Sequence, residues 1–246
     1  MREQHYQELH DIEATYWWFQ VRFRVVADVL RARQLLGPDA YLIDWGCGTG
    51  GFLEYLLRHG HVDRHQICGV EPGLPAHRVL ADKGIPFVTP QSGTGHSATP
   101  QRRATVVTML DVLEHVDDRP AFLREVQRWT VPDATLVLTV PAFRFLWSGW
   151  DDVLGHKARY TAAGLRADLI AAGWPPVKNR YLFQSMFFAA FFRSVLLRRS
   201  IARSQFPRVS PAVNAALIAW HRVETALPGL PFGTSVLAVA RRGSTA

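Results

Sequence analysis

The sequence predicts a doubly wound α/β domain, in which a mostly parallel sheet is covered by helices on both faces. From residue 41 onward, short apolar runs alternate with helical patterns, as is typical of strands that are buried on both sides. A glycine-rich turn at residues 46–51 follows the first apolar run and leads directly into a helical pattern. The length of 246 residues fits a single large domain, 1–246.

Each expected element follows from its own local pattern. Apolar or β-branched runs predict strands at residues 41–45, 66–70, 86–88, 105–110, 134–140, 177–183 and 234–240. Helical spacing of apolar residues predicts helices at 52–59, 74–82, 119–129, 161–172, 185–203 and 211–226. Pro141 ends one strand, and Thr161 and Gly173 mark the two ends of a helix. Residues 89–103, rich in Gly, Ser, Thr and Pro, predict a loop.

We expect four parts within this domain. Residues 1–36 form an N-terminal helical arm and residues 37–184 form the core. Residues 185–231 form a helical insertion before the last strand, and residues 232–246 form that strand and a tail.

The composition limits the classes of function. The net charge is +7, but the basic residues are mostly Arg, single or in pairs, and no basic block predicts nucleic-acid binding. The positive field favours anionic small molecules or an anionic membrane surface. Cys47 and Cys68 are the only cysteines, which excludes a disulfide scaffold and favours a reduced, cytoplasmic location. The N-terminus lacks the apolar stretch of a signal peptide.

The glycine turn permits two interpretations. Gly46, Gly48 and Gly51 satisfy G-x-G-x-x-G, and Glu71 lies downstream as in nicotinamide-binding sites, so an NAD(P)-dependent oxidoreductase is one alternative. Asp44 argues against it, because an acid two residues before the first glycine would repel a pyrophosphate. A carboxylate there suits a ligand that presents a cation.

The pattern Asp44-x-Gly46-x-Gly48-x-Gly50 resembles the first motif of class I S-adenosylmethionine (SAM)-dependent methyltransferases. The resemblance extends over residues 41–141, including VVTMLDVLEH at 106–115. Residues 16–24, 147–161 and 230–235 resemble a bacterial subgroup similar to the type 11 and type 12 methyltransferases. Residues 89–91 and Thr105 depart from the family pattern near the adenine.

This resemblance implies a Rossmann-like fold, SAM as cofactor and a set of cofactor contacts. Glu71 would accept the ribose hydroxyls, and Asp44 would bind the amino group of the methionine part. The implied cofactor-binding residues are Asp44, Gly46, Cys47, Gly48, Gly50, Glu71, Pro72, Leu110 and Asp111.

Candidate catalytic residues lie after the predicted fourth and fifth strands. His115 could act as a general base, since an ordinary histidine pKa suits proton removal, or could simply begin a helix. His156 and Tyr160 are further catalytic candidates. Residues after the fifth strand border the ligand crevice of open α/β sheets, so Asp151 and Arg159 are expected on the acceptor side. Tyr16, Trp17 and Trp18 are expected to contact the acceptor as a lid, or to pack the arm on the sheet.

A divalent metal is a further alternative. Asp111, Glu114 and His115 could clamp an ion with oxygen and nitrogen ligands, and His156 could complete the set. Some methyltransferases with a similar turn use Mg²⁺ or Zn²⁺ to bind the acceptor oxygen, whereas metal-free relatives often carry the same turn. We expect no metal requirement.

The run MFFAAFF at residues 186–192 is apolar on all sides. It predicts a pocket wall or a dimer contact, with peripheral membrane contact through residues 181–203 as the alternative. The expected function is methyl transfer to a small, hydrophobic or anionic acceptor, with oxygen preferred over carbon or nitrogen. A non-catalytic accessory protein on the same core is the remaining alternative, and a monomer and a homodimer are both compatible with the sequence.

Overall fold

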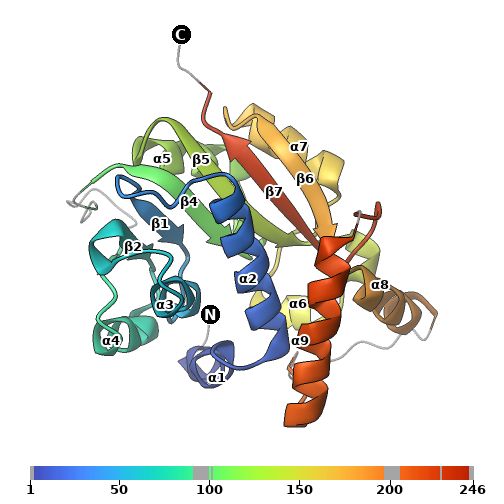
Figure 1. Cartoon of the computed structure of the whole chain (residues 1–246). Coiled ribbons are helices and arrows are strands. Elements are labelled where there is room, and N and C mark those ends of the chain that lie inside the picture. Colours follow the sequence, from blue (N-terminus) through green and yellow to red (C-terminus); the bar gives the residue numbers. More distant parts are fainter. Residues whose placement is uncertain (1–2, 91–99, 101, 197–205, 228, 244–246) are drawn as a thin grey trace.

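The computed structural model describes residues 3–90, 100, 102–196, 206–227 and 229–243. Its centre is a seven-stranded sheet in the order β3-β2-β1-β4-β5-β7-β6 (Figure 1). The strands are β1 Leu42–Trp45, β2 Ile67–Val70, β3 Phe87–Val88, β4 Ala104–Leu110, β5 Thr130–Pro141, β6 Pro176–Leu182 and β7 Ser235–Arg241. Strands β1 to β5 pair in parallel, whereas β7 runs antiparallel to both β5 and β6. The predicted doubly wound, Rossmann-like α/β fold is confirmed.

Helices cover both faces of the sheet (Figure 1). They are α1 Glu3–Glu13, α2 Trp17–Ala32, α3 Gly51–Arg58, α4 Leu74–Asp82, α5 Arg119–Arg128, α6 Gly149–Leu154, α7 Ala162–Ala171, α8 Gln184–Phe191 and α9 Pro211–Ala226. One core contains the buried side chains of α5 and α7, together with Trp174. The other contains those of α2, α3 and α4. The central strands β1, β4 and β7 are mostly apolar because both of their faces are covered, whereas the edge strand β6 carries Lys178, Asn179 and Arg180.

The N-terminal arm covers one face of the sheet with α2, and α1 lies near the end of the sheet at which β1 and β2 end (Figure 1). Helix α2 packs against α9, so the arm and the insertion before β7 are neighbours (Figure 1). Lys83, at the end of α4, donates to Glu13 of α1 over 2.6 Å. These contacts bring the arm beside the glycine turn.

The structure differs from the sequence prediction in two places. Residues 149–154 form α6, a short helix that the sequence patterns did not predict. Ser148 and Asp151 form a capping box at its start, and Gly155 ends it with φ of 72°. The helix expected at 185–203 is α8 followed by a π-helical turn, Phe192–Leu196. The rest of that helix, and most of the loop expected at 89–103, lie outside the described residues. Within the described part of the chain, every helix is too short or too polar to cross a membrane.

Candidate functional site

A cavity of about 680 Å³ lies beyond the carboxyl ends of β1, β2, β4 and β5. Its lining includes the predicted residues Asp44, Gly46, Cys47, Gly48, Glu71, Leu110, Asp111, His115, His156, Arg159, Tyr16, Trp17 and Trp18. Gly50, Pro72, Asp151 and Tyr160 are not part of the lining. Most of the residues predicted from the sequence therefore line one cavity, and the other four lie outside its lining.

The glycine turn follows β1 and forms the floor of this cavity. Gly46 and Gly50 have φ values of 72° and 81°, which side-chain-bearing residues rarely adopt. A Cβ atom at position 46 would lie 2.5 Å from Val112 Cγ2, and one at position 50 would lie 2.7 Å from Ile85 Cδ1. Tight packing therefore requires glycine at these two positions.

Glu71 lies just beyond β2 and is only 4% exposed. Its Oε2 accepts from the backbone N–H of Gly48 over 2.8 Å, and its Oε1 accepts from that of Gly73 over 2.7 Å. The Tyr6 hydroxyl of the arm also donates to Oε1, over 2.9 Å. These three donors hold the Glu71 carboxylate in place. Its oxygens can still accept further hydrogen bonds from the hydroxyls of a ligand.

Asp44 belongs to β1 and is 3% exposed. Thr108 of β4 donates to Asp44 Oδ1 over 2.7 Å. Burial raises the pKa of Asp44 to about 7, although the Thr108 hydrogen bond and the charge of Arg22 oppose the shift. A cationic ligand would stabilise the charged form of Asp44, and a buried carboxylate with a raised pKa therefore suits such a ligand.

Asp111 follows β4 with a positive φ of 57° and forms an ion pair with Arg22 of α2. Thr139 donates to its other oxygen over 2.9 Å. The guanidinium of Arg22 lies 4.1 Å from the ring centroid of Trp18, an arrangement that favours the cation. Sequence reasoning assigned no role to Arg22 or Tyr6, and their contacts join the arm to the core across long stretches of chain.

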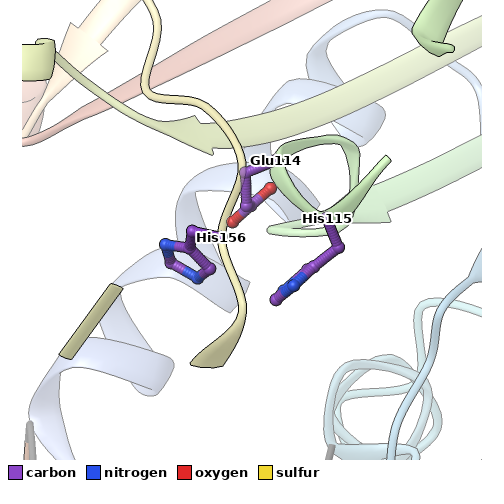
Figure 2. A group of neighbouring side chains, drawn as sticks. All are labelled: Glu114, His115 and His156. Atoms are coloured by element: carbon purple, nitrogen blue, oxygen red, sulfur yellow. The ribbon is translucent and has the colours of Figure 1, made fainter. Parts of the chain in front are cut away.

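Side chains from two segments converge at the end of the cavity beyond β4. Figure 2 shows Glu114 and His115, from the turn after β4, next to His156, which follows α6. One ligand atom from each of the three lies within 4.8 Å of the other two. Of the residues considered for a metal, Glu114, His115 and His156 lie together, whereas Asp111 pairs with Arg22.

The ring of His156 is oriented by Asp151. The His156 Nδ1 lies 2.8 Å from Asp151 Oδ1, and Arg159 donates to both carboxylate oxygens over 2.7 and 3.0 Å. Asp151 is 1% exposed; burial alone would raise its pKa, but the hydrogen bonds from His156 and Arg159 hold the pKa well below its ordinary value. Asp151 is therefore a buried anion that fixes His156 from behind the wall.

His115 and Glu114 have strongly altered proton affinities. Burial and the neighbouring His156 lower the pKa of His115 to about 4, so the ordinary value assumed from sequence does not hold. Burial, and then the charge of Asp111, raise the pKa of Glu114 well above its ordinary range. Neither carboxylate oxygen of Glu114 has a hydrogen-bond partner among the described residues. His115 is therefore neutral near neutral pH, and the burial of Glu114 favours its uncharged form.

Tyr160 does not reach the cavity. Its hydroxyl donates to the backbone carbonyl of Leu113 over 3.2 Å, and burial raises its pKa. The catalytic role expected of Tyr160 is not supported by this position, because the hydroxyl is held by the turn that carries Glu114 and His115.

Part of the cavity lining is apolar. It is formed by aromatic residues of the arm, by one face of α8 and by the start of the described segment 206–227. Its lining residues are Trp17, Trp18, Phe19, Met186, Ala189, Ala190, Phe206, Pro207, Val209 and Leu217. Arg193 is the one cation of α8 and its π-helical turn in this wall. A cavity lined by both charged and apolar residues suits a polar ligand bound together with a hydrophobic one.

Comparisons with known proteins agree with this geometry. A family model described as a methyltransferase domain matches residues 17–179. The ubiquinone biosynthesis O-methyltransferase of Rhodopseudomonas palustris (strain BisA53) is 30% identical over 100 residues, which are 39% of this chain and 38% of that protein. That of Methylobacterium nodulans (strain LMG 21967 / CNCM I-2342 / ORS 2060) is 33% identical over 129 residues, 49% of this chain and 50% of that protein. The chain thus matches half or less of the length of these relatives.

Solved structures show the same fold. A SAM-dependent methyltransferase from Thermotoga maritima aligns with a TM-score of 0.56 at 17% identity, covering 98% of this chain and 97% of that one. One from Mesorhizobium loti aligns with a TM-score of 0.54 at 17% identity, covering 87% and 96%. With a family model that matches more than half of its length, and with this sheet and glycine turn, the chain belongs to the class I SAM-dependent methyltransferases.

Proposed function

We propose that this methyltransferase transfers the methyl group of SAM to a hydroxyl oxygen of a hydrophobic small molecule. The observation that supports this most directly is that one cavity is lined both by the buried carboxylates of Asp44 and Glu71 and by an apolar wall. The relatives named ubiquinone biosynthesis O-methyltransferase are consistent with an oxygen acceptor on a hydrophobic molecule. We further propose a cytoplasmic location for the enzyme.

In this proposal the two buried carboxylates hold the two ends of the cofactor. Asp44 binds the ammonium group of the methionine part, because a cation offsets the cost of its buried charge. Glu71 accepts the ribose hydroxyls, and its fixed geometry sets the position of the sugar. His156 and Arg159 line the same cavity as these two carboxylates, so they would be available to an acceptor beside the bound cofactor.

His156 is the proposed general base. Its Nδ1 is engaged by Asp151, which leaves Nε2 to take the proton of the acceptor hydroxyl. SAM supplies the methyl group, and its sulfur keeps the electron pair of the broken C–S bond as S-adenosylhomocysteine leaves. The proton remains on His156, whose positive charge is balanced by Asp151. Alignment of the acceptor by the apolar wall provides the rest of the rate enhancement.

Labelled SAM and a matched pair of acceptors test this proposal. A phenol that carries a long alkyl or prenyl chain is compared with the same phenol without the chain. We expect label in the long-chain product and a much higher KM for the short acceptor, because only the chain contacts the apolar wall. An intact protein that binds S-adenosylhomocysteine but methylates neither phenol, nor any amine or carbon analogue, would favour the accessory-protein alternative.

A further inference from the structure

We propose that Arg193 binds a carboxylate on the acceptor, which makes the acceptor a hydrophobic hydroxy acid. Arg193 belongs to the π-helical turn after α8 and lines the cavity together with Met186, Ala189 and Ala190 of that helix. The identity of the methylated hydroxyl rests on the proposed function, whereas the anion site itself does not.

The three arginines of the cavity lining differ in their partners. Arg22 forms an ion pair with Asp111, and Arg159 donates to both carboxylate oxygens of Asp151. Arg193 has neither a hydrogen bond nor an ion pair within the parts of the chain that the structure describes, and its Nε is buried without an acceptor. A buried donor without an acceptor costs free energy, and an anionic ligand would offset that cost.

Arg193 belongs to an apolar part of the cavity wall. Residues 184–196 and 206–217 supply this part of the lining, and their sequences contain no Asp or Glu. Glu224 of α9 accepts hydrogen bonds from the backbone N–H and the hydroxyl of Ser185, at the end of α8 away from Arg193. A charge-assisted hydrogen bond is stronger in apolar surroundings than in water, so this wall favours an anion of the ligand at Arg193.

A single positive charge favours a carboxylate over a phosphate. Arg208 is the other cation of these two wall segments, but its side chain is exposed and is not part of the lining. A phosphate monoester carries about two negative charges at neutral pH, of which Arg193 would balance one. The planar guanidinium also presents paired donors that match the two oxygens of a carboxylate.

The position of Arg193 assigns it to the acceptor rather than to the cofactor. Figure 1 shows α8 beside the β6 edge of the sheet, whereas β2, which Glu71 follows, lies toward the other edge. The turn that carries Arg193 packs against residues 144–146, which follow β5. The cofactor has its own carboxylate next to its ammonium group, and Arg22 is the arginine whose charge acts on Asp44. An anion at Arg193 therefore comes from the acceptor.

Matched pairs of acceptors test the anion site. Each pair is a phenol with an alkyl chain that ends either in a carboxylate or in a primary carboxamide, over a range of chain lengths. Labelled SAM gives KM and kcat at about pH 8, where the carboxylate is ionised. The variants are R193Q, R193K and the control R208Q, which removes an exposed charge between Pro207 and Val209 of the same wall. Circular dichroism establishes that each variant is folded.

We expect the wild type to have an about tenfold lower KM for the acid than for the amide, with one preferred chain length. R193Q should raise the KM of the acid by about tenfold and leave the KM of the amide unchanged. R193K keeps the charge without the planar donor pair and should be intermediate, whereas R208Q should match the wild type. Equal KM values for acid and amide in the wild type, or an acid preference that R193Q retains or R208Q also removes, would overturn the site. Weaker binding of S-adenosylhomocysteine by folded R193Q would assign Arg193 to the cofactor instead.

Binding without turnover separates this inference from the proposed function. The acid and the amide are titrated into wild type and R193Q, each saturated with S-adenosylhomocysteine, and calorimetry measures their affinities. A preference for the acid that R193Q removes, without methylation of any acceptor, would refute the proposed function and support the anion site. Methylation of both phenols with equal KM and equal affinity would support the proposed function and refute the anion site.

Discussion

Thr108 and Asp44 face each other on neighbouring parallel strands, and the threonine hydroxyl donates to Asp44 Oδ1 over 2.7 Å. Both side chains are buried, so this neutral donor is one of few groups that favour the charged carboxylate. Because burial still raises the pKa of Asp44 to about 7, the carboxylate changes charge within the physiological range.

Cofactor affinity should therefore depend on pH. Below the raised pKa of Asp44 the carboxyl is protonated and cannot pair with an ammonium group, so affinity falls as pH falls. We expect S-adenosylhomocysteine to bind about tenfold more weakly at about pH 6 than at about pH 8 by isothermal titration calorimetry. D44N should bind weakly at both pH values. A wild-type affinity that is constant across this range would contradict the assignment.

Removal of either member of the Asp151–His156 pair should reduce turnover without loss of cofactor binding. H156Q removes the proposed base, and D151N removes the anion that orients it, so kcat should fall by about 10²-fold or more. Because Asp151 also binds Arg159, its loss should raise the KM of the acceptor as well. Stopped assays with labelled SAM measure kcat, and calorimetry provides the binding control. H156Q with wild-type kcat would exclude the base role.

Turnover should survive chelation. Glu114 is one of three side chains that could hold a divalent ion, but burial raises its pKa and so disfavours the charged carboxylate that binds a metal well. We expect unchanged rates after dialysis against EDTA. Activity that disappears on chelation and returns with Mg²⁺ or Zn²⁺ would instead assign an ion to Glu114, His115 and His156.

The arm should contribute to stability through Arg22 and Asp111. The guanidinium and carboxylate are 7% and 20% exposed, so R22M leaves a mostly buried charge without its partner. We expect the free energy of unfolding to fall by about 3 kcal/mol in urea titrations. R22M/D111N should lose less than the sum of the two single variants, because the second change removes the unpaired charge. Strictly additive losses would mean that the pair contributes no coupling.

Local sequence patterns predicted the core better than the contacts of the arm. The glycine turn and the acids that end β1 and β2 are set by strand geometry, so Asp44 and Glu71 could be placed from sequence. The contacts of Tyr6 with Glu71 and of Arg22 with Asp111 join residues 65 and 89 positions apart, and no periodic pattern encodes them. Helix α6 is short, and its capping box is a local polar pattern without apolar periodicity, so no helix was predicted there.

The sequence also did not show whether a residue lines the cavity or lies behind the residues that line it. Asp151, His156 and Tyr160 come from one segment, yet only His156 lines the cavity. Asp151 supports His156 from behind, and Tyr160 binds the backbone of Leu113. Such assignments depend on the packing of α6 against the turn after β4, which becomes visible only in three dimensions.

The central claim is that Asp44 and Glu71 bind opposite ends of the cofactor, and calorimetry on three proteins tests it most directly. Wild type, D44N and E71Q are titrated with S-adenosylhomocysteine at about pH 8, where Asp44 is charged. The account predicts tight binding by the wild type and a loss of about a hundredfold in each variant, since each loses a charge-assisted contact in a buried site. Wild-type affinity in either folded variant would contradict it.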